Sequence, residues 1–423
     1  MSWLVAILLM FVLFALNMRI YLAMFAGILT YFLFFSDLPL AIAVQRIVAP
    51  TQNVSLLAIP FFILLGTLLG ATAVAKRLLA LADLLVGRLT GGLGHTNVML
   101  STLMGGISAS NLADAAMATR MIVPQMIQQG YSRGSATAIT ACASLITPII
   151  PPGIALIIYG LVADVSIGSM FMAGIVPGLL CCALLLVAVY IYAKRRGIPP
   201  SRTTWPAASE TRSVIFEAWP ALALVVVIVG GIRMGVFTPT EAGAVAIVLT
   251  LLIGFFLYRD MKIGDVGRAL GETARQTASI MLVIMTSTGL AWIFSNERAG
   301  IAMAEWITGL TSNKYVFLLA VNVLLLGLGM FVEGTALMIV LVPLLKPALA
   351  QFGIDPVHFG IVIIVNLSIG TLTPPVGTVL LLVCNLTRAS IGEFFREGWM
   401  FVAALVVALL LVTYVPILSL ALI

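Results

Sequence analysis

Residues 141–153 read Ala-Cys-Ala-Ser-Leu-Ile-Thr-Pro-Ile-Ile-Pro-Pro-Gly, and residues 366–377 read Asn-Leu-Ser-Ile-Gly-Thr-Leu-Thr-Pro-Pro-Val-Gly. Each stretch lies within a long apolar run and follows an apolar segment rich in Gly, Ser and Thr. Because proline removes a backbone donor and breaks helices, each stretch predicts a helix that is interrupted within the membrane. Paired interruptions at corresponding places in two halves of a membrane chain indicate a site for an ion or a polar substrate.

The composition places the chain in a membrane. Of its 423 residues, 62% are hydrophobic and 9% are charged, whereas a soluble domain carries about 25% charged residues. We therefore expect an all-α integral membrane protein. The net charge of +6 is interpreted as loop charge that sets orientation. No basic stretch has the interleaved aromatic residues of a nucleic-acid groove, so no nucleic-acid partner is expected.

Several classes of chemistry find no support in the sequence. The four cysteines lie in apolar runs without a CxxC motif, and His95 and His358 have no ligand neighbours at metal spacing. The chain has no phosphate-binding or dinucleotide motif, and none of the residue pairs that an intramembrane protease uses. We therefore expect neither an enzyme nor an ATP-driven pump, no cofactor, and energy supplied by an ion gradient.

Ten apolar runs approach or exceed the roughly 20 residues that a helix needs to cross a membrane. They lie near residues 3–17, 20–36, 54–74, 133–163, 167–193, 216–236, 240–258, 277–296, 356–387 and 394–421. The runs 133–163 and 356–387 contain the two quoted stretches and are predicted to be broken helices. Two further apolar segments, about 97–129 and about 315–350, are interspersed with Gly, Ser and acidic residues. Each is predicted to be a re-entrant hairpin.

The distribution of Lys and Arg orients these spans. If Lys194, Arg195 and Arg196 are cytoplasmic, nearly every other basic loop is cytoplasmic too, as the positive-inside rule requires. Both termini are then predicted on the external face. The first apolar run lacks a basic leading region and a cleavage motif, so it is interpreted as a retained span.

The same assignment divides the chain into two halves. Residues 1–193 and 216–423 flank a polar cytoplasmic linker, 194–215, and each half has five predicted crossings and one hairpin followed by a broken helix. Because five is odd, the second half is inverted relative to the first. The alternative is that the prolines kink helices and the glycines help packing, as is common in membrane helices. The recurrence after a hairpin in both halves favours the inverted repeat.

Four shorter segments are predicted to be helices in the membrane interface. Residues 75–92 and 260–276 are amphipathic and lie on the predicted cytoplasmic face, and 38–50 and 299–312 are weaker external counterparts. These helices are either a frame against which a core slides or plain connectors, and both interpretations fit the pattern.

The tip of the first hairpin is small and polar. The hydroxyls of Ser108 and Ser110 and the amide oxygen of Asn111 are hard ligands of the kind that Na⁺ accepts. The facing break adds Ser144, Thr147 and the carbonyls that its prolines free. We expect a sodium site here; the alternative is hydrogen bonding between helices, at about 1 kcal/mol a pair.

The tip of the second hairpin carries Glu333. A carboxylate in the middle of a membrane costs at least about 2.5 kcal/mol, so we expect this one to have a function. The options are ligation of a cation, acceptance of hydrogen bonds from the substrate, and carriage of a proton. The same argument applies more weakly to Asp114 in the first hairpin, because Arg120 lies six residues further on and is a possible structural partner.

Further stretches of the chain are distinctive. They read Gly-Ile-Ser-Ala-Ser-Asn-Leu-Ala-Asp-Ala-Ala (106–116), Thr-Pro-Ile-Ile-Pro-Pro-Gly (147–153) and Gly-Ile-Asp-Pro-Val-His-Phe-Gly-Ile-Val (353–362). Together with 366–377 they resemble the large membrane (M, DctM-type) subunit of tripartite ATP-independent periplasmic (TRAP) transporters, over essentially the whole chain. The resemblance implies an ion-transporter-superfamily fold: inverted repeats with about ten crossings, two re-entrant hairpins, and an elevator-type core that moves against a scaffold.

The resemblance also implies a function and partners. The function is secondary active transport: sodium-gradient-driven uptake of an organic acid, such as a dicarboxylate or a sugar acid, across the bacterial inner membrane. One partner is a periplasmic substrate-binding protein that delivers the substrate. The other is a small four-helix membrane subunit, expected as a separate chain because this chain starts directly at its own first span. Na⁺ is then the coupling ion, and membrane lipids surround the protein.

Site residues follow from the same resemblance. One sodium site would use the first tip, with Ser108, Ser110 and Asn111, and the break near Thr147. The second sodium site would use Gly334, Thr335, Gly370 and Thr373.

We expect the substrate between the two tips, near Ser110, Asn111, Glu333, Pro151 and Pro374. Sodium would order the tips, and substrate would complete the site before the core moves. A stand-alone anion–sodium symporter of the same superfamily, which needs no binding protein, is a second interpretation. A channel or an intramembrane enzyme is a third, although a channel does not need two inverted broken helices that close over a central site.

Overall fold

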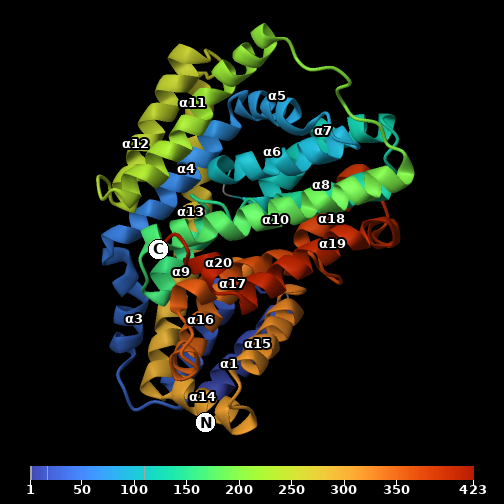
Figure 1. The fold of residues 1–423 in the computed structure, drawn as a ribbon. Coiled ribbons are helices and arrows are strands. Elements are labelled where there is room, and N and C mark those ends of the chain that lie inside the picture. The colour runs from blue at the N-terminus through green and yellow to red at the C-terminus, as the bar shows by residue number, and fades with distance from the viewer. Residues whose placement is uncertain (1, 17, 109) are drawn as a thin grey trace.

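The computed structural model describes residues 2–16, 18–108 and 110–423, and within these residues it contains helices and no strand (Figure 1). The helices of the first half are α1 (Ser2–Ala15), α2 (Ile20–Phe34), α3 (Leu40–Val48), α4 (Ala58–Gly70), α5 (Val74–Val86), α6 (Gly92–Ser108), α7 (Asn111–Gln128), α8 (Arg133–Ser144), α9 (Ile154–Ala163) and α10 (Ile167–Arg196). Two short 3₁₀ turns, Ala49–Gln52 and Val54–Leu57, join α3 to α4.

The second half has a similar order of helices. They are α11 (Ala208–Arg233), α12 (Pro239–Leu252), α13 (Ile263–Asn296), α14 (Ala299–Leu310), α15 (Lys314–Gly329), α16 (Gly334–Gln351), α17 (Pro356–Gly370), α18 (Thr378–Thr387), α19 (Ile391–Tyr414) and the short α20 (Ile417–Leu420). A π-helical turn, Ile253–Leu257, extends α12.

Length and hydropathy identify the helices that can cross a membrane. Within the described residues, six are long and apolar enough, namely α10, α11, α12 with its π turn, α13, α16 and α19. A seventh candidate is the pair Leu40–Gln52 and Val54–Gly70, which is bent by 60°. The chain is therefore a multi-pass membrane protein. The ten crossings predicted from the sequence also count helices of 10–17 residues, which are shorter than the roughly 20 residues of a full span.

Both proline-rich stretches interrupt helices, as the sequence predicts. The first separates α8 from α9, and the second separates α17 from α18. A proline in these positions cannot donate the next helical hydrogen bond, and its ring clashes with the preceding turn. Each break contains one cis peptide bond between adjacent prolines, at Pro151–Pro152 and at Pro374–Pro375.

Each segment predicted to form a hairpin consists of two helices. The first is α6 followed by α7, and these two helices pack against each other. The second is α15 followed by α16, which are separated by residues 330–333. Ala109, at the predicted tip of the first hairpin, lies outside the described residues.

One prediction about helix boundaries was wrong. The sequence indicated an interfacial helix over 260–276 and a separate span over 277–296, but α13 is one helix of 34 residues that covers both. It begins where the Asp265 carboxylate accepts a hydrogen bond from the backbone N–H of Lys262, at 2.9 Å. Between Gly271 and Gly289 the chain has neither glycine nor proline, so nothing stops the helix where its polar half meets its apolar half.

The packing of the central helices repeats with the two halves exchanged. Helix α7 packs against α18, and α16 packs against α9. In the same way, α8 packs against α18, and α17 packs against α9. The second part of each broken helix therefore lies against the hairpin and the broken helix of the other half.

Another group of helices, which includes α3, α4, α11 and α12, forms a frame beside this centre. Figure 1 shows α3, α4, α11 and α12 along one side of the molecule, and α6, α7, α8, α18 and α19 on the other. Helix α13 packs against α2, α3 and α4 and also touches α16. Charged contacts hold α5 in place, because Arg77 pairs with Asp260 at 2.9 Å and Asp83 pairs with Arg202 at 2.5 Å.

Candidate functional site

The two hairpin tips border a common cavity of about 220 Å³, which we call the inter-tip cavity. Its lining comes from the starts of α7 and α16, from both breaks and from the middle of α13. The polar members of the lining are Ser110, Asn111, Gln276, Glu333, Thr335, Ser368, Thr371 and Thr378, and the apolar members include Pro148, Ile154, Ala155, Ile280 and Leu367. The lining contains no lysine or arginine.

Four helices begin at residues that line the inter-tip cavity. They are α7 at Asn111, α9 at Ile154, α16 at Gly334 and α18 at Thr378. A helix N-terminus carries unpaired N–H groups and a partial positive charge. A helix start that the chain itself leaves uncapped can therefore bind an anion without a basic side chain.

Three of these four helix starts already have acceptors from the chain. Ser110 Oγ accepts a hydrogen bond from the first turn of α7 at 3.4 Å. The carboxylate of Glu333 accepts two from the first turn of α16, at 3.0 and 3.1 Å. The carbonyl of Thr371 accepts two from the first turn of α18, at 3.1 and 3.2 Å. Helix α9 follows Gly153, which has no side chain to cap it, so its first turn is the one best placed to receive a bound anion.

The structure gives Glu333 a local function that the sequence argument did not consider. The residue is the N-cap of α16, and its two carboxylate oxygens each accept one backbone hydrogen bond. Capping with a carboxylate also compensates the positive end of the helix dipole. Glu333 still lines the inter-tip cavity, so a bound ligand would meet a carboxylate that is already held in place.

The polar side chains of the first tip are partly exposed and so remain open to a ligand. Ser108 Oγ donates to the carbonyl of Ser110 at 3.4 Å, and Asn111 Oδ1 accepts from the next backbone N–H at 2.9 Å. Both hydroxyl oxygens and the amide oxygen keep lone pairs for a cation.

The first break presents carbonyl groups to the hairpin. A Cβ atom built on Gly105 would lie 3.4 Å from the carbonyl oxygen of Thr147, and one built on Gly106 would lie 3.3 Å from that of Pro151. Glycine at these positions therefore allows the end of α6 to come close to the carbonyls of the break. Freed carbonyls beside hydroxyl groups are the ligand types of a sodium site.

The structure brings five of the predicted site residues together. Ser110, Asn111, Glu333, Gly334 and Thr335 all line the inter-tip cavity.

The remaining predicted residues lie outside its lining. Ser108 lines an adjoining cavity, whereas Ser144, Thr147, Gly370, Thr373, Pro151 and Pro374 line neither of the two. The hydroxyls of Ser144 and Thr373 donate to carbonyls of their own segments, at 2.9 and 3.1 Å. Gly370 instead touches the backbone of α15, where a Cβ on Gly370 would lie 3.0 Å from Gly329 Cα.

Sequence reasoning missed part of the lining. Gln276 and Ile280 come from α13, in a region that the sequence divided between an interfacial helix and a span. Ser368 and Thr371 belong to the second proline-rich stretch. Both could have been predicted as site residues, because hydroxyl residues beside a helix break are candidate ligands. No local signal identifies Gln276, since its place in the wall depends on how α13 packs.

The inter-tip cavity adjoins a larger one of about 700 Å³. The two share Ser110, Ile154 and Gln276 in their linings. The larger cavity also reaches charged residues at the start of α13, including the ion pair of Asp265 and Arg268. The larger cavity therefore extends from the first tip to the side of the molecule that the positive-inside rule predicts to be cytoplasmic.

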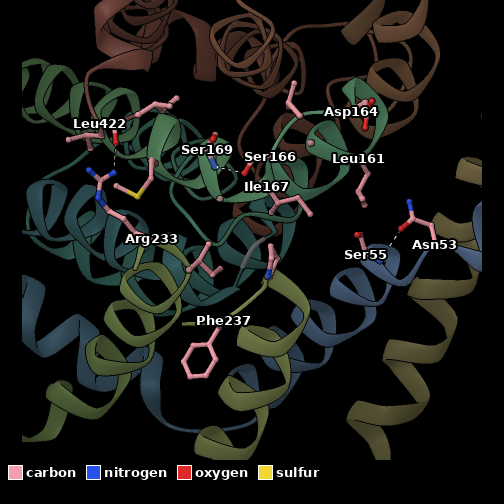
Figure 2. A pocket seen from close by; sticks show the side chains of 17 residues that line it. Asn53, Ser55, Leu161, Asp164, Ser166, Ile167, Ser169, Arg233, Phe237 and Leu422 are labelled. Atoms are coloured by element: carbon pink, nitrogen blue, oxygen red, sulfur yellow. Dashed lines mark hydrogen bonds between the residues drawn. The ribbon is translucent and has the colours of Figure 1, made fainter. Parts of the chain in front are cut away.

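Another cavity, of about 560 Å³, lies away from the tips (Figure 2). It is lined by Asn53 and Ser55, the end of α9, the start of α10, the corner between α11 and α12, and residues 422–423. Figure 2 shows Arg233 beside Leu422, whose carbonyl accepts a hydrogen bond from it, and Ser166 beside Ser169. It shares no lining residue with the inter-tip cavity and contains none of the predicted site residues, so we do not assign the substrate to it.

The chain is similar to known proteins over most of its length. Residues 7–418 match the family model described as "Tripartite ATP-independent periplasmic transporter, DctM component". The sialic acid TRAP transporter large permease protein SiaM of Vibrio cholerae is 39% identical over 376 residues, which are 88% of this chain and 87% of that protein. The C4-dicarboxylate TRAP transporter large permease protein DctM of Pseudomonas aeruginosa is 35% identical over 401 residues, which are 94% and 92% of the two chains.

A solved structure shares the fold. The crystal structure of the YdaH transporter of Alcanivorax borkumensis superposes with a TM-score of 0.62 over 88% of this chain and 86% of that chain, at 16% sequence identity. At this identity the likeness concerns the fold alone. It agrees with the all-helical architecture of the described residues.

Proposed function

Because the chain belongs to the DctM-component family of tripartite ATP-independent periplasmic (TRAP) transporters, we propose that it takes up an organic acid by secondary active transport driven by a sodium gradient. The family and these relatives are transporter permeases, so the chain is a transport protein and not an enzyme. One observation carries the proposal: the first turn of α9, which no side chain caps, begins at the wall of a cavity of about 220 Å³ between the two hairpin tips.

The substrate class follows from the cavity and from the relatives. The relatives in Vibrio cholerae and Pseudomonas aeruginosa are named for sialic acid and for C4-dicarboxylates, and both are carboxylates. In the inter-tip cavity, a carboxylate would accept hydrogen bonds from the uncapped first turn of α9. The hydroxyl of Ser110 and the amide of Asn111 would then hold the rest of the substrate, and Pro148 and Ala155 would close the apolar wall.

Sodium would bind beside the substrate at the two tips. For the first ion we propose Ser108, Ser110 and Asn111, with carbonyls of the break near Thr147. A cation there offsets the negative charge of the substrate, so each ligand favours the binding of the other.

The second ion would lie at the start of α16. We propose Gly334 and Thr335 from the tip, with Gly370 and Thr373 from the break as its support. The carboxylate of Glu333 stands at the same tip and increases the attraction for a cation.

The exchanged packing of the halves supports an inverted repeat, with residues 1–193 as one unit and 216–423 as the other. In this arrangement the two hairpins and the two broken helices form a core that moves like an elevator against the frame. The frame contributes α13, whose Gln276 and Ile280 line the cavity in the present conformation. The adjoining cavity on the predicted cytoplasmic side fits a core that has reached its inward position.

We further propose the setting in which the chain works. It would lie in the bacterial inner membrane, with both termini on the periplasmic side and its basic loops in the cytoplasm. A periplasmic binding protein would deliver the substrate, and a small four-helix membrane subunit, as a separate chain, would complete the complex. The tripartite description of the family supports both partners.

Sodium is expected to stabilise the purified chain. In detergent, the thermal midpoint should be higher in NaCl than in matched KCl or choline chloride, because a ligand that binds the native state alone raises stability, by about 2.7 kcal/mol at 100 times its Kd. Ser110→Ala and Thr335→Ala should each weaken this response, since each removes one hydroxyl at a tip. Equal midpoints for the wild-type chain in all three salts would contradict sodium coupling.

A further inference from the structure

Behind the first tip, α7 holds a carboxylate that has no cationic partner. The side chain of Asp114 is 0% exposed. Its Oδ2 accepts a hydrogen bond from Thr147 Oγ1 at 3.1 Å, and its Oδ1 has no hydrogen-bond partner among the described residues. None of the ion pairs in the described part of the chain involves Asp114, and Arg120, the partner considered from the sequence, is not within pairing distance. A buried carboxylate with a free oxygen is costly unless a cation balances it.

The polar groups that lie near Asp114 supply oxygen ligands. Ser101 Oγ, on α6, is also fully buried and faces the Asp114 carboxylate, but the two do not form a hydrogen bond of good geometry. The carbonyl oxygen of Ser101 lies 3.4 Å from Thr147 Oγ1, whose single proton is nearer to Asp114 Oδ2. One carboxylate, two hydroxyls and one carbonyl therefore converge from α6, α7 and the first break.

These observations indicate that the buried polar groups of α6, α7 and the first break bind an ion. We propose that Asp114, Ser101 and Thr147 form an interior cation site for Na⁺, separate from the ion sites at the tips. Hard oxygen ligands favour a hard cation. A single carboxylate is balanced by a single positive charge, whereas a divalent ion would leave a net charge in a buried place. The inference rests on the proposed sodium coupling.

The interior site is distinct from the tip in position but shares its route to solvent. Ser101 precedes Ser108 by seven residues, which is about 10 Å along a helix. Asp114 nevertheless lines the 700 Å³ cavity together with Ser108 and Ser110. An ion would therefore pass the tip on its way to Asp114.

An ion in this place ties three segments together. It bridges both arms of the first hairpin to the break, in which Pro148 follows Thr147 and lines the inter-tip cavity. Filling the interior site fixes the position of the break, and with it the first turn of α9. Sodium thereby preorganises the carboxylate-binding end of the cavity before the substrate arrives.

The test compares the purified full-length chain with Asp114→Asn, using thermal unfolding and ²²Na⁺ equilibrium binding. In choline chloride the variant should be more stable than the wild type, because an unbalanced buried charge is gone. In saturating NaCl the order should reverse, and the Na⁺ concentration for half-maximal stabilisation should rise by about 10–100-fold. A merely structural Asp114 predicts no such reversal, since asparagine still accepts the hydrogen bond from Thr147. An Asp114→Asn response to Na⁺ that equals the wild type would overturn the proposal.

Two further variants distinguish the interior site from the ion site at the first tip. Ser101→Ala removes a ligand and no charge, so it should weaken the Na⁺ response without stabilising the chain in choline; it decides the matter if Asp114→Asn does not fold. Ser110→Ala removes a ligand of the proposed ion site at the first tip, so its response to Na⁺ measures the contribution of that site. A response lost in Ser110→Ala but intact in Asp114→Asn and Ser101→Ala overturns the interior site alone, whereas no response in the wild type overturns sodium coupling itself. Equal stabilisation by KCl would overturn the assignment to Na⁺.

Discussion

Ala155→Phe should abolish uptake while leaving the chain folded. Ala155 is the second residue of α9 and lines the inter-tip cavity beside Ile154. A phenyl ring there fills the space in front of the uncapped first turn of α9, where we place the substrate carboxylate. Because misplacement of a bound group by about 1 Å can already cost 100-fold in rate, we expect a loss of at least about that size. The readout is the initial rate of uptake into proteoliposomes.

The control is the same substitution at an exposed alanine. Ala208, at the start of α11, is exposed and lines none of the cavities described above. Ala208→Phe should leave uptake near the wild-type rate. The thermal midpoint of Ala155→Phe in choline chloride should stay close to that of the wild type, because the ring enters an existing space. Normal uptake by a folded Ala155→Phe would remove the inter-tip cavity from consideration as the substrate site.

Gly174→Ala should destabilise the chain and impair uptake together. Gly174 lies in α10, directly against the first break, and a Cβ built on it would lie 2.2 Å from the carbonyl oxygen of Ile149. The obstacle is backbone, so the break itself must move. Overpacking of this kind costs about 1–3 kcal/mol. Because Pro148, the neighbour of Ile149, lines the inter-tip cavity, the displacement also reaches the substrate site.

Gly230→Ala provides a matched comparison for Gly174→Ala. Gly230 also lies inside a long helix, α11, but a Cβ built on it would meet nothing within 4 Å. Alanine should stabilise this helix by about 0.5–1 kcal/mol relative to glycine. The two variants are therefore expected to shift the thermal midpoint in opposite directions. A Gly174→Ala chain as stable and as active as Gly230→Ala would show that the break does not depend on close contact with α10.

The helix breaks, the start of α7 and the membrane location could be predicted from the sequence, because each depends on residues that are neighbours in the chain. Both breaks are marked by adjacent prolines, Pro151–Pro152 and Pro374–Pro375, whereas isolated prolines lie inside α7, α10 and α11 without ending them. Ser110 precedes α7 as its N-cap, as its residue type favours. The chain also lacks charge over long stretches, which is enough to identify a membrane protein. Small and polar residues within two apolar segments indicated both hairpins, and with them Ser110, Asn111 and Glu333 of the inter-tip cavity. Gly334 and Thr335 were assigned through the family resemblance, and both also line this cavity.

The features that the sequence did not predict depend on contacts between distant segments. The hydroxyl of Thr147 donates to Asp114, 33 residues away, so it faces the interior instead of the tip. Gln276 reaches the cavity only because α13 continues without a break and packs beside the hairpins. The capping role of Glu333 is local and was predictable in principle, since a carboxylate directly before a helix is a common N-cap.

The central claim is that a sodium gradient drives an organic acid through this chain. The direct measurement is uptake into proteoliposomes that contain the chain and its small membrane subunit, with the binding protein outside, for a panel of labelled acids that includes sialic acid and C4-dicarboxylates. With Na⁺ high outside and K⁺ inside, we predict that one acid accumulates above its external concentration, and that Ala155→Phe abolishes this accumulation. Equal uptake with and without the sodium gradient would contradict the account.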